Sequence, residues 1–342
     1  MSLRRLKLGL LQLAEELVDV RPFPGRRVAT LVHAMVAGAD GIDGAGLLRS
    51  ASTAEVLGHT VIAPSTLGTF LRTLDLGHAR QLDRLSELLL VRAWAMGAGP
   101  GGAPMTIDVD STICEVHGEQ KQGAAYGDTK VLGYHPLLAT RADTGEVLHF
   151  RLREGSAGSG RGAQRFVREL VGRIRRRGVS GSLTLRADAG FYSAKVMKAC
   201  GDHHVACSIT APQNPSVSAA IEQIDEGAWT PIDYTANGEA FVAETAYQGH
   251  RLIVRRTKLA DAQPALFPTF RYHAFVTNRS GDAVFFDADH HRHAVVELAI
   301  RDLEEKAGLS HLPSGRFGAN GAWTVLSSIA HNLVRWLAAL GM

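Results

Sequence analysis

The spacing of apolar residues changes near residue 100. Before that point, apolar positions recur at helical intervals, and Pro22, Pro24 and the run AGADGIDGAG interrupt them. This pattern predicts an all-helical region over 1–100. Its first helix is expected to be amphipathic, with an apolar face that contains Leu10, Leu13, Leu17 and Val18.

A pair of helices is predicted toward the end of this region. Ser65 is expected to cap the run STLGTFLRTL, and a second helix follows in HARQLDRLSELLLVRAWAM. Such pairs occur in DNA-binding modules, but most of them simply pack a core. We therefore treat 1–100 as a candidate DNA-binding domain and leave core packing open as the alternative.

Beyond the Gly- and Pro-rich stretch GAGPGGAP, at 97–104, strand patterns alternate with helical ones. A strand in MTIDVDST precedes a hairpin that turns at Asp143-Thr144-Gly145, where Gly supplies the positive φ of a tight turn. A helix, a strand, a helix and a strand follow in QRFVRELVGRIRRR, SLTLRAD, SAKVMKACG and VACSIT. This order predicts the first part of an RNase H-like α/β domain over 101–212, a mixed sheet with flanking helices.

The last third of the chain contains more strands and two helices. The runs AFVAETAY, RLIVRRTK and YHAFVTN predict a β-rich insertion over 213–285, which forms its own sheet or extends the main one. Residues 286–342 are expected to form a helix around HAVVELAIRDL and a C-terminal helix. That last helix is apolar but contains His331, Asn332 and Arg335, which are costly in lipid, so we expect it to pack in the core and not to enter a membrane.

Three carboxylates are candidate metal ligands and catalytic residues. Asp110 and Asp188 each close a predicted strand, and Glu297 lies on the later helix. Strand ends are the usual ligand edge of such sheets, and carboxylate oxygens suit hard divalent cations. The alternation of apolar and polar residues puts Asp108 and Asp110 on the same face of the strand, so it does not decide which of them is the ligand. Each acid also has an ordinary structural alternative. The aspartates could begin a turn or cap a helix, and Glu297 could form an i,i+4 pair with Arg301.

Positive charge is concentrated in one segment. The formal net charge of the chain is only +3, yet nine Arg stand against Glu154 and Glu169 between Arg151 and Gly178, a local net of +7. Such clustering favours a track for a DNA backbone over a solvated helix face. The candidate DNA-binding residues are Lys121, Lys130, Arg161, Arg165 and Arg292.

Other chemistries are disfavoured by spacing. The glycine-rich run GSAGSGRGA lacks the Gly-Lys-Ser/Thr ending of a phosphate-binding loop, which leaves nucleotide hydrolysis without a basis. The neighbouring histidines at 290, 291 and 293 do not follow a zinc motif. No C-x-x-C spacing occurs, and a reducing cytoplasm suits the three cysteines, Cys114, Cys200 and Cys207.

Five short segments, taken together and in this order, resemble those of a known protein family. The segments DVDST (108–112), HGEQ (117–120), LGYHPLLA (132–139), ADAGFY (187–192) and HAVVELAIRDL (293–303) resemble those of a bacterial insertion-sequence transposase of the DDE type. The similarity is greatest to the cut-and-paste branch with a β-strand insertion before the last Glu. It runs from about residue 25 to the end.

The resemblance implies a function and a site. Asp110, Asp188 and Glu297 would be the catalytic acids and the ligands of two Mg²⁺ ions, for which Mn²⁺ can substitute. The implied partners are the terminal inverted repeats of a transposon, target DNA and a second copy of the chain in the synaptic complex. The implied location is the bacterial cytoplasm, at the nucleoid.

This chain departs from the family pattern around the last acid. Related transposases carry Tyr, Arg and Lys where this sequence has His290, His293 and Glu304, and Arg292 and Lys306 are the nearby basic residues that could replace them. Two other functions remain open: a truncated or inactive copy that binds transposon ends without cutting, and a stand-alone RNase H-like metal nuclease.

Overall fold

The computed structural model describes residues 9–50, 52–118, 120–127, 129–235, 238–259 and 270–341. Residues 1–8 of the predicted first helix and Glu119 of the segment HGEQ lie outside these ranges. The described residues before 100 are helical, as predicted, and form α1 (Leu10–Leu17), α2 (Pro24–Val36), η2 (Ile42–Arg49), α3 (Thr53–Leu57), α4 (Pro64–Thr73), α5 (Leu76–Ala93) and η3 (Trp94–Ala98).

Two local predictions in this region have different outcomes. The amphipathic first helix is confirmed, because Leu10 and Leu13 are buried on α1. The predicted cap at Ser65 is wrong: α4 begins at Pro64 and Ala63 is its N-cap residue. Proline suits the first turn of a helix because the amide that it lacks would have no partner there.

A nine-stranded sheet is the main sheet of the described residues after 100, in the order β6-β5-β1-β7-β8-β12-β11-β10-β9. In its first half β1 pairs antiparallel with β5 and parallel with β7, and β8 is parallel to β7. This is the RNase H-like arrangement that the element order predicted. The strands are β1 (Met105–Ser111), β5 (Leu137–Arg141), β6 (Val147–Arg151), β7 (Leu183–Ala187), β8 (Val205–Thr210), β9 (Thr230–Ile232), β10 (Gly238–Tyr247), β11 (His250–Leu259) and β12 (Arg271–Thr277).

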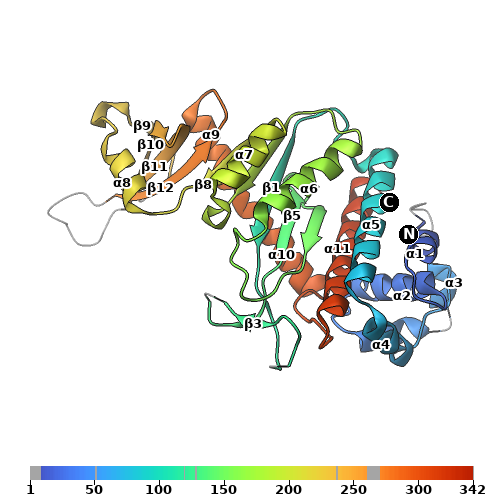
Figure 1. The fold of residues 1–342 in the computed structure, drawn as a ribbon. Coiled ribbons are helices and arrows are strands. Elements are labelled where there is room, and N and C mark those ends of the chain that lie inside the picture. Colours follow the sequence, from blue (N-terminus) through green and yellow to red (C-terminus); the bar gives the residue numbers. More distant parts are fainter. Residues whose placement is uncertain are drawn as a thin grey trace.

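The insertion extends this sheet. Strand β12 pairs antiparallel with β8, for example Val276 with Ile209, so the four insertion strands continue the main sheet. Figure 1 shows β9 to β12 at one end of an elongated molecule and α1 to α5 at the other. A second, small sheet that the sequence did not reveal follows β1 and contains β2 (Cys114–Glu115), β3 (Ala125–Tyr126) and β4 (Leu132–Tyr134).

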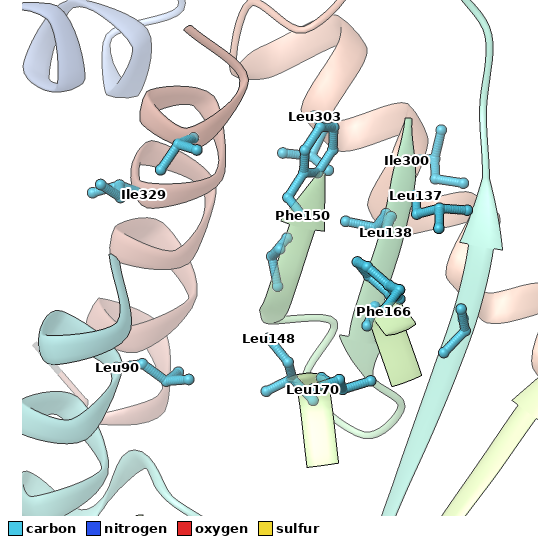
Figure 2. Close-up of a cluster of buried hydrophobic side chains, with 14 of the residues drawn as sticks. Leu90, Leu137, Leu138, Leu148, Phe150, Phe166, Leu170, Ile300, Leu303 and Ile329 are labelled. Carbon is cyan, nitrogen blue, oxygen red and sulfur yellow. The ribbon is translucent and has the colours of Figure 1, made fainter. Parts of the chain in front are cut away.

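The helices beyond the first region are α6 (Ala163–Arg176), η4 (Ala189–Phe191), α7 (Ala194–Asp202), α8 (Pro215–Glu222), η5 (Glu226–Ala228), α9 (Ala283–His291), η6 (Arg292–Ala294), α10 (Val295–Lys306) and α11 (Phe317–Ala339). One apolar core joins several of them to the sheet. Figure 2 shows the side chains in this core, among them Leu90 of α5, Ile329 of α11, Phe150 of β6, Phe166 of α6 and Leu303 of α10.

The C-terminal helix α11 covers the edge strand β6. Asn332 accepts a hydrogen bond from the Val147 amide at 2.7 Å and donates one to the Val147 carbonyl at 2.8 Å, so its side chain replaces a neighbouring strand. The His331 ring lies 2.9 Å from the Gly145 carbonyl. The polar residues of α11 thus bind the hairpin, which confirms the predicted core packing. No helix in the described ranges is long and apolar enough to cross a membrane.

Replacing Asn332 with Leu should lower the free energy of unfolding by roughly 2–4 kcal/mol, since the buried Val147 amide and carbonyl would lose their partners. Urea unfolding followed by circular dichroism measures this loss. Val334→Ala on the exposed side of the same helix should stay within about 0.5 kcal/mol of the unchanged protein. Equal losses in the two variants would contradict the edge-capping role.

Acidification should destabilise the protein between pH 6.5 and about 4. Burial lowers the pKa of His33, His273 and His331 from 6.5 to about 4 in the folded state. In this window the unfolded chain binds protons that the folded chain does not, so the contribution of these groups to stability is complete above pH 6.5 and decreases as the pH falls. Urea midpoints across the window should decrease less steeply for His331→Gln; an equal slope would contradict this assignment.

Candidate active site

Two of the three predicted acids leave the sheet at the same edge. Strands β1 and β7 are parallel neighbours in which Val109 pairs with Ala187, and Asp110 and Asp188 are the next residues of each. The Ser111 amide donates to Asp110 Oδ1 at 2.7 Å, and the Gly190 amide donates to Asp188 Oδ1 at 3.1 Å. A backbone amide therefore orients each carboxylate: that of Ser111 at the end of β1 for Asp110, and that of Gly190 in the turn after β7 for Asp188.

Glu297 lies in the first turn of α10, which packs on β1 through its apolar face. The side chain is exposed, while its neighbour Val296 is buried. The ion pairs of this helix join Asp302 to Lys306 and to Arg335, and none in the described part of the chain joins Glu297 to Arg301. The surface pair that offered the ordinary explanation for Glu297 is thus not formed.

The three acids share one electrostatic environment. Burial raises the pKa of Asp110 to about 6, and the negative charges of Asp188 and Glu297 add to the increase, against the opposing effects of the Ser111 amide and His293. Burial also raises the pKa of Asp188. The negative charges of the three acids repel one another, and a bound cation would relieve that repulsion.

The donor set suits a hard divalent cation, because all three side chains offer oxygen ligands. Within the described ranges, however, no three His, Cys, Asp or Glu side chains are already arranged to hold a metal ion. The carboxylates of Asp110 and Asp188 bond to backbone amides instead. Each of these two carboxylates still has a second oxygen without a backbone partner among these bonds.

Asp108, the alternative to Asp110, has a structural partner. It is fully buried, and Arg186 donates to both of its oxygens, at 2.7 and 2.9 Å. The same guanidinium contacts Asp289, which also pairs with Arg279. This buried network joins β1 and β7 to α9, so the structure favours Asp110 as the available acid of the pair.

The residues that replace the family's Tyr, Arg and Lys differ in position. His293 Nε2 lies 3.2 Å from the Val109 carbonyl, and its charge lowers the pKa of Asp110 and Asp188. His290 is buried, with its ring nitrogens bonded to hydroxyls of β8. Glu304 accepts from the Thr112 hydroxyl at 3.0 Å. Only His293 of the three lies beside the aspartates.

Comparison with known proteins now decides the family. The model of the family described as "Transposase DDE domain group 1" matches residues 24–342. The chain belongs to this DDE transposase family. It is accordingly a DNA transposase, an enzyme that cleaves DNA.

A solved structure shares the fold of this transposase. The piggyBac transposase in a synaptic complex with hairpin DNA, determined by cryo-electron microscopy, superposes with a TM-score of 0.54 at 12% sequence identity, over 98% of this chain and 71% of that one. At this identity the likeness concerns the fold. No curated protein matches the sequence.

Most arginines of the segment Arg151–Gly178 have partners inside the transposase. Arg173 forms a bidentate pair with Asp83 of α5, Arg165 pairs with Glu169 at 2.8 Å, and others bind carboxylates or carbonyls. Acids distant in sequence therefore balance much of the local charge. Of the two candidate DNA-binding residues in this segment, Arg161 is exposed and has no ion-pair partner among the described residues, whereas Arg165 is 74% exposed and pairs with Glu169.

The other candidate DNA-binding residues of the transposase lie in different settings. Lys121 donates to the Leu312 carbonyl, which ties the segment after β2 to the loop before α11. Lys130 is exposed. Arg292 lines a shallow cavity with Asp143 at the Met105 end of β1, away from Asp110. Lys121 and Arg292 therefore lie apart from the three candidate acids.

Three polar side chains near the acids were missed from the sequence. Ser111 Oγ lies 2.9 Å from Ser159 Oγ and 3.0 Å from His135 Nε2, and the charge of His135 lowers the pKa of Asp188. His135 belongs to the segment LGYHPLLA, and Ser159 belongs to the glycine-rich run that was weighed only as a nucleotide site. Their position in those two segments was the available signal.

Proposed function

We propose that this transposase cuts DNA at the ends of an insertion sequence, with Asp110, Asp188 and Glu297 holding two Mg²⁺ ions for which Mn²⁺ can substitute. The observation that carries the proposal is the position of Asp110 and Asp188, each directly after the paired residues Val109 and Ala187 of adjacent parallel strands, with Glu297 near enough for its charge to act on Asp110. The oxygen donor set and the raised pKa of Asp110, to about 6, support it.

When bound, such ions would activate a water and stabilise the departing 3′ oxygen of a phosphodiester. The protein's part is to orient the ligands. Asp110 and Asp188 are fixed on adjacent strands, and Glu297 approaches from the exposed first turn of α10. His293, held at the Val109 carbonyl, occupies the place of the family's Arg, and we assign it a contact with the substrate phosphate.

The proposed partners are duplex DNA at the terminal inverted repeats, target DNA and a second copy of the chain. Support comes from the fold shared with a transposase solved as a synaptic complex with hairpin DNA. A freed 3′ hydroxyl would then attack the opposite strand or the target. The expected place of action is the bacterial nucleoid.

Incubation with duplexes that carry the repeats flanking the reading frame tests this proposal. Cleavage at the repeat boundary that requires Mg²⁺ or Mn²⁺ is expected. Binding without cleavage would instead indicate an inactive copy, and cutting that ignores the repeat would indicate a general nuclease; either result would overturn the proposal.

A further inference from the structure

A glycine-rich loop, residues 155–162, lies against the end of β1 that carries Asp110 and the turn after β7 that carries Asp188. Ser159 Oγ is 2.9 Å from the hydroxyl of Ser111, the residue after Asp110. On the other side, a Cβ added to Gly190, two residues after Asp188, would lie 2.6 Å from Ser159 Cβ. The loop is therefore packed beside the acids, where a bound DNA strand would have to pass.

Arg153 donates hydrogen bonds to backbone carbonyls on one side of this loop. Its guanidinium donates to the carbonyls of Gly158 at 2.9 Å and Arg161 at 2.7 Å, and to that of His135 at 2.8 Å. In a trans peptide the N–H points opposite to the C=O, so the amides of the following residues, Ser159 and Gly162, are directed away from Arg153. Neither amide has a hydrogen-bond partner within the described residues.

The loop and the two residues before it carry two arginines, Arg153 and Arg161, against one exposed acid, Glu154. Arg161 is exposed and has no ion pair in the described ranges, and Arg153 Nη2 is buried without a hydrogen-bond partner there. Helix α6 begins directly after the loop and has no side-chain cap, which adds the positive end of its dipole. Outward amides beside an unpaired arginine are groups that bind anions.

Close packing against neighbouring backbone explains why this loop contains several glycines. A Cβ on Gly155 would lie 2.1 Å from the Gly133 carbonyl oxygen, and one on Gly160 would lie 3.1 Å from that of Gly190. Gly162 has a φ of 79°. The small residues thus let the loop backbone approach the strand ends closely enough to present its amides beside the acids.

We propose that residues 155–162 form a phosphate-binding loop, which holds the DNA backbone next to the scissile phosphodiester through the Arg161 guanidinium and the amides of Ser159 and Gly162. The inference rests on the proposed function, since the acids define where the scissile bond lies. It differs from a nucleotide site because the ligand is a phosphodiester of a DNA strand, fixed by charge and amides and not by base contacts.

The test uses a mixed-sequence duplex of about 30 base pairs in EDTA, because phosphate contacts do not depend on sequence. Fluorescence anisotropy over a range of KCl concentrations should show about tenfold weaker binding for Arg161→Ala and a log–log salt slope smaller by about 0.9, with partial recovery in Arg161→Lys. The control Arg168→Ala removes the same charge from α6 at a site paired with Asp202, and should leave the slope unchanged.

Hydrogen exchange gives a second readout. Saturating duplex should slow exchange of the amides of Ser159 and Gly162. Unprotected loop amides, or an equal change of slope in the Arg161 and Arg168 variants, would overturn the inference. Because EDTA prevents cleavage, these results are independent of whether Asp110→Asn abolishes cutting, which tests the proposed function separately.

Discussion

Asp110→Asn should reduce metal-dependent DNA cleavage by a factor of about 10³ or more, because loss of one carboxylate ligand removes several kcal/mol of transition-state stabilisation. Asp188→Asn and Glu297→Gln should have effects of the same order. The fold should persist. Burial and neighbouring acids already raise the pKa of Asp110 to about 6, so a neutral side chain there relieves repulsion. The melting temperature should be unchanged or higher.

Cleavage rates and thermal melts on the same preparations check this expectation. Glu305→Gln provides the matched control, since Glu305 is an exposed carboxylate on the same helix as Glu297. That variant should cleave at the unchanged rate. Normal cleavage by Asp110→Asn, or a comparable loss in Glu305→Gln, would remove the basis for assigning the acids.

A substitution at Asp108, two residues before Asp110 on β1, should instead reduce stability. Asp108→Ala should lower the free energy of unfolding by about 3–5 kcal/mol, because Arg186 would keep a buried charge without its bidentate partner. The side chains of the pair are 0% and 3% exposed, so solvent cannot compensate. Urea unfolding measures the loss.

A double variant separates the ion pair from its packing. Asp108→Ala combined with Arg186→Met should recover part of the stability lost in Asp108→Ala, since no uncompensated charge remains at that position. Reduced DNA cleavage in these variants should follow the folded fraction. If Asp108→Ala unfolds at the same urea concentration as the unchanged protein, the structural role of Asp108 is wrong.

The pair Asp108 and Asp110 shows how far sequence reasoning reaches. Alternation correctly put both on one face of a strand, but the choice between them depends on Arg186, which is 78 residues away. Local patterns contain no information about that contact. The same limit applies to Ser159 and His135, which meet Ser111 only because the sheet brings their segments together.

Counting charges along the sequence also could not show which arginines are neutralised by acids from distant segments. The nine arginines between Arg151 and Gly178 were counted against the two acids of their own segment, whereas Asp83 of α5 and Asp202 of α7 neutralise two of them in space. Likewise, the insertion strands could be predicted individually, but their attachment to the main sheet depends on the pairing of β12 with β8. Local periodicity identified the elements, and long-range contacts decided their roles.

A crystal structure with Mn²⁺ tests the central claim most directly, because anomalous scattering locates the metal independently of the protein atoms. We expect manganese peaks bound by oxygens of Asp110, Asp188 and Glu297, with Asp108 still paired to Arg186. Peaks elsewhere, or a metal that leaves Glu297 in solvent, would contradict the assignment of these three acids as one site.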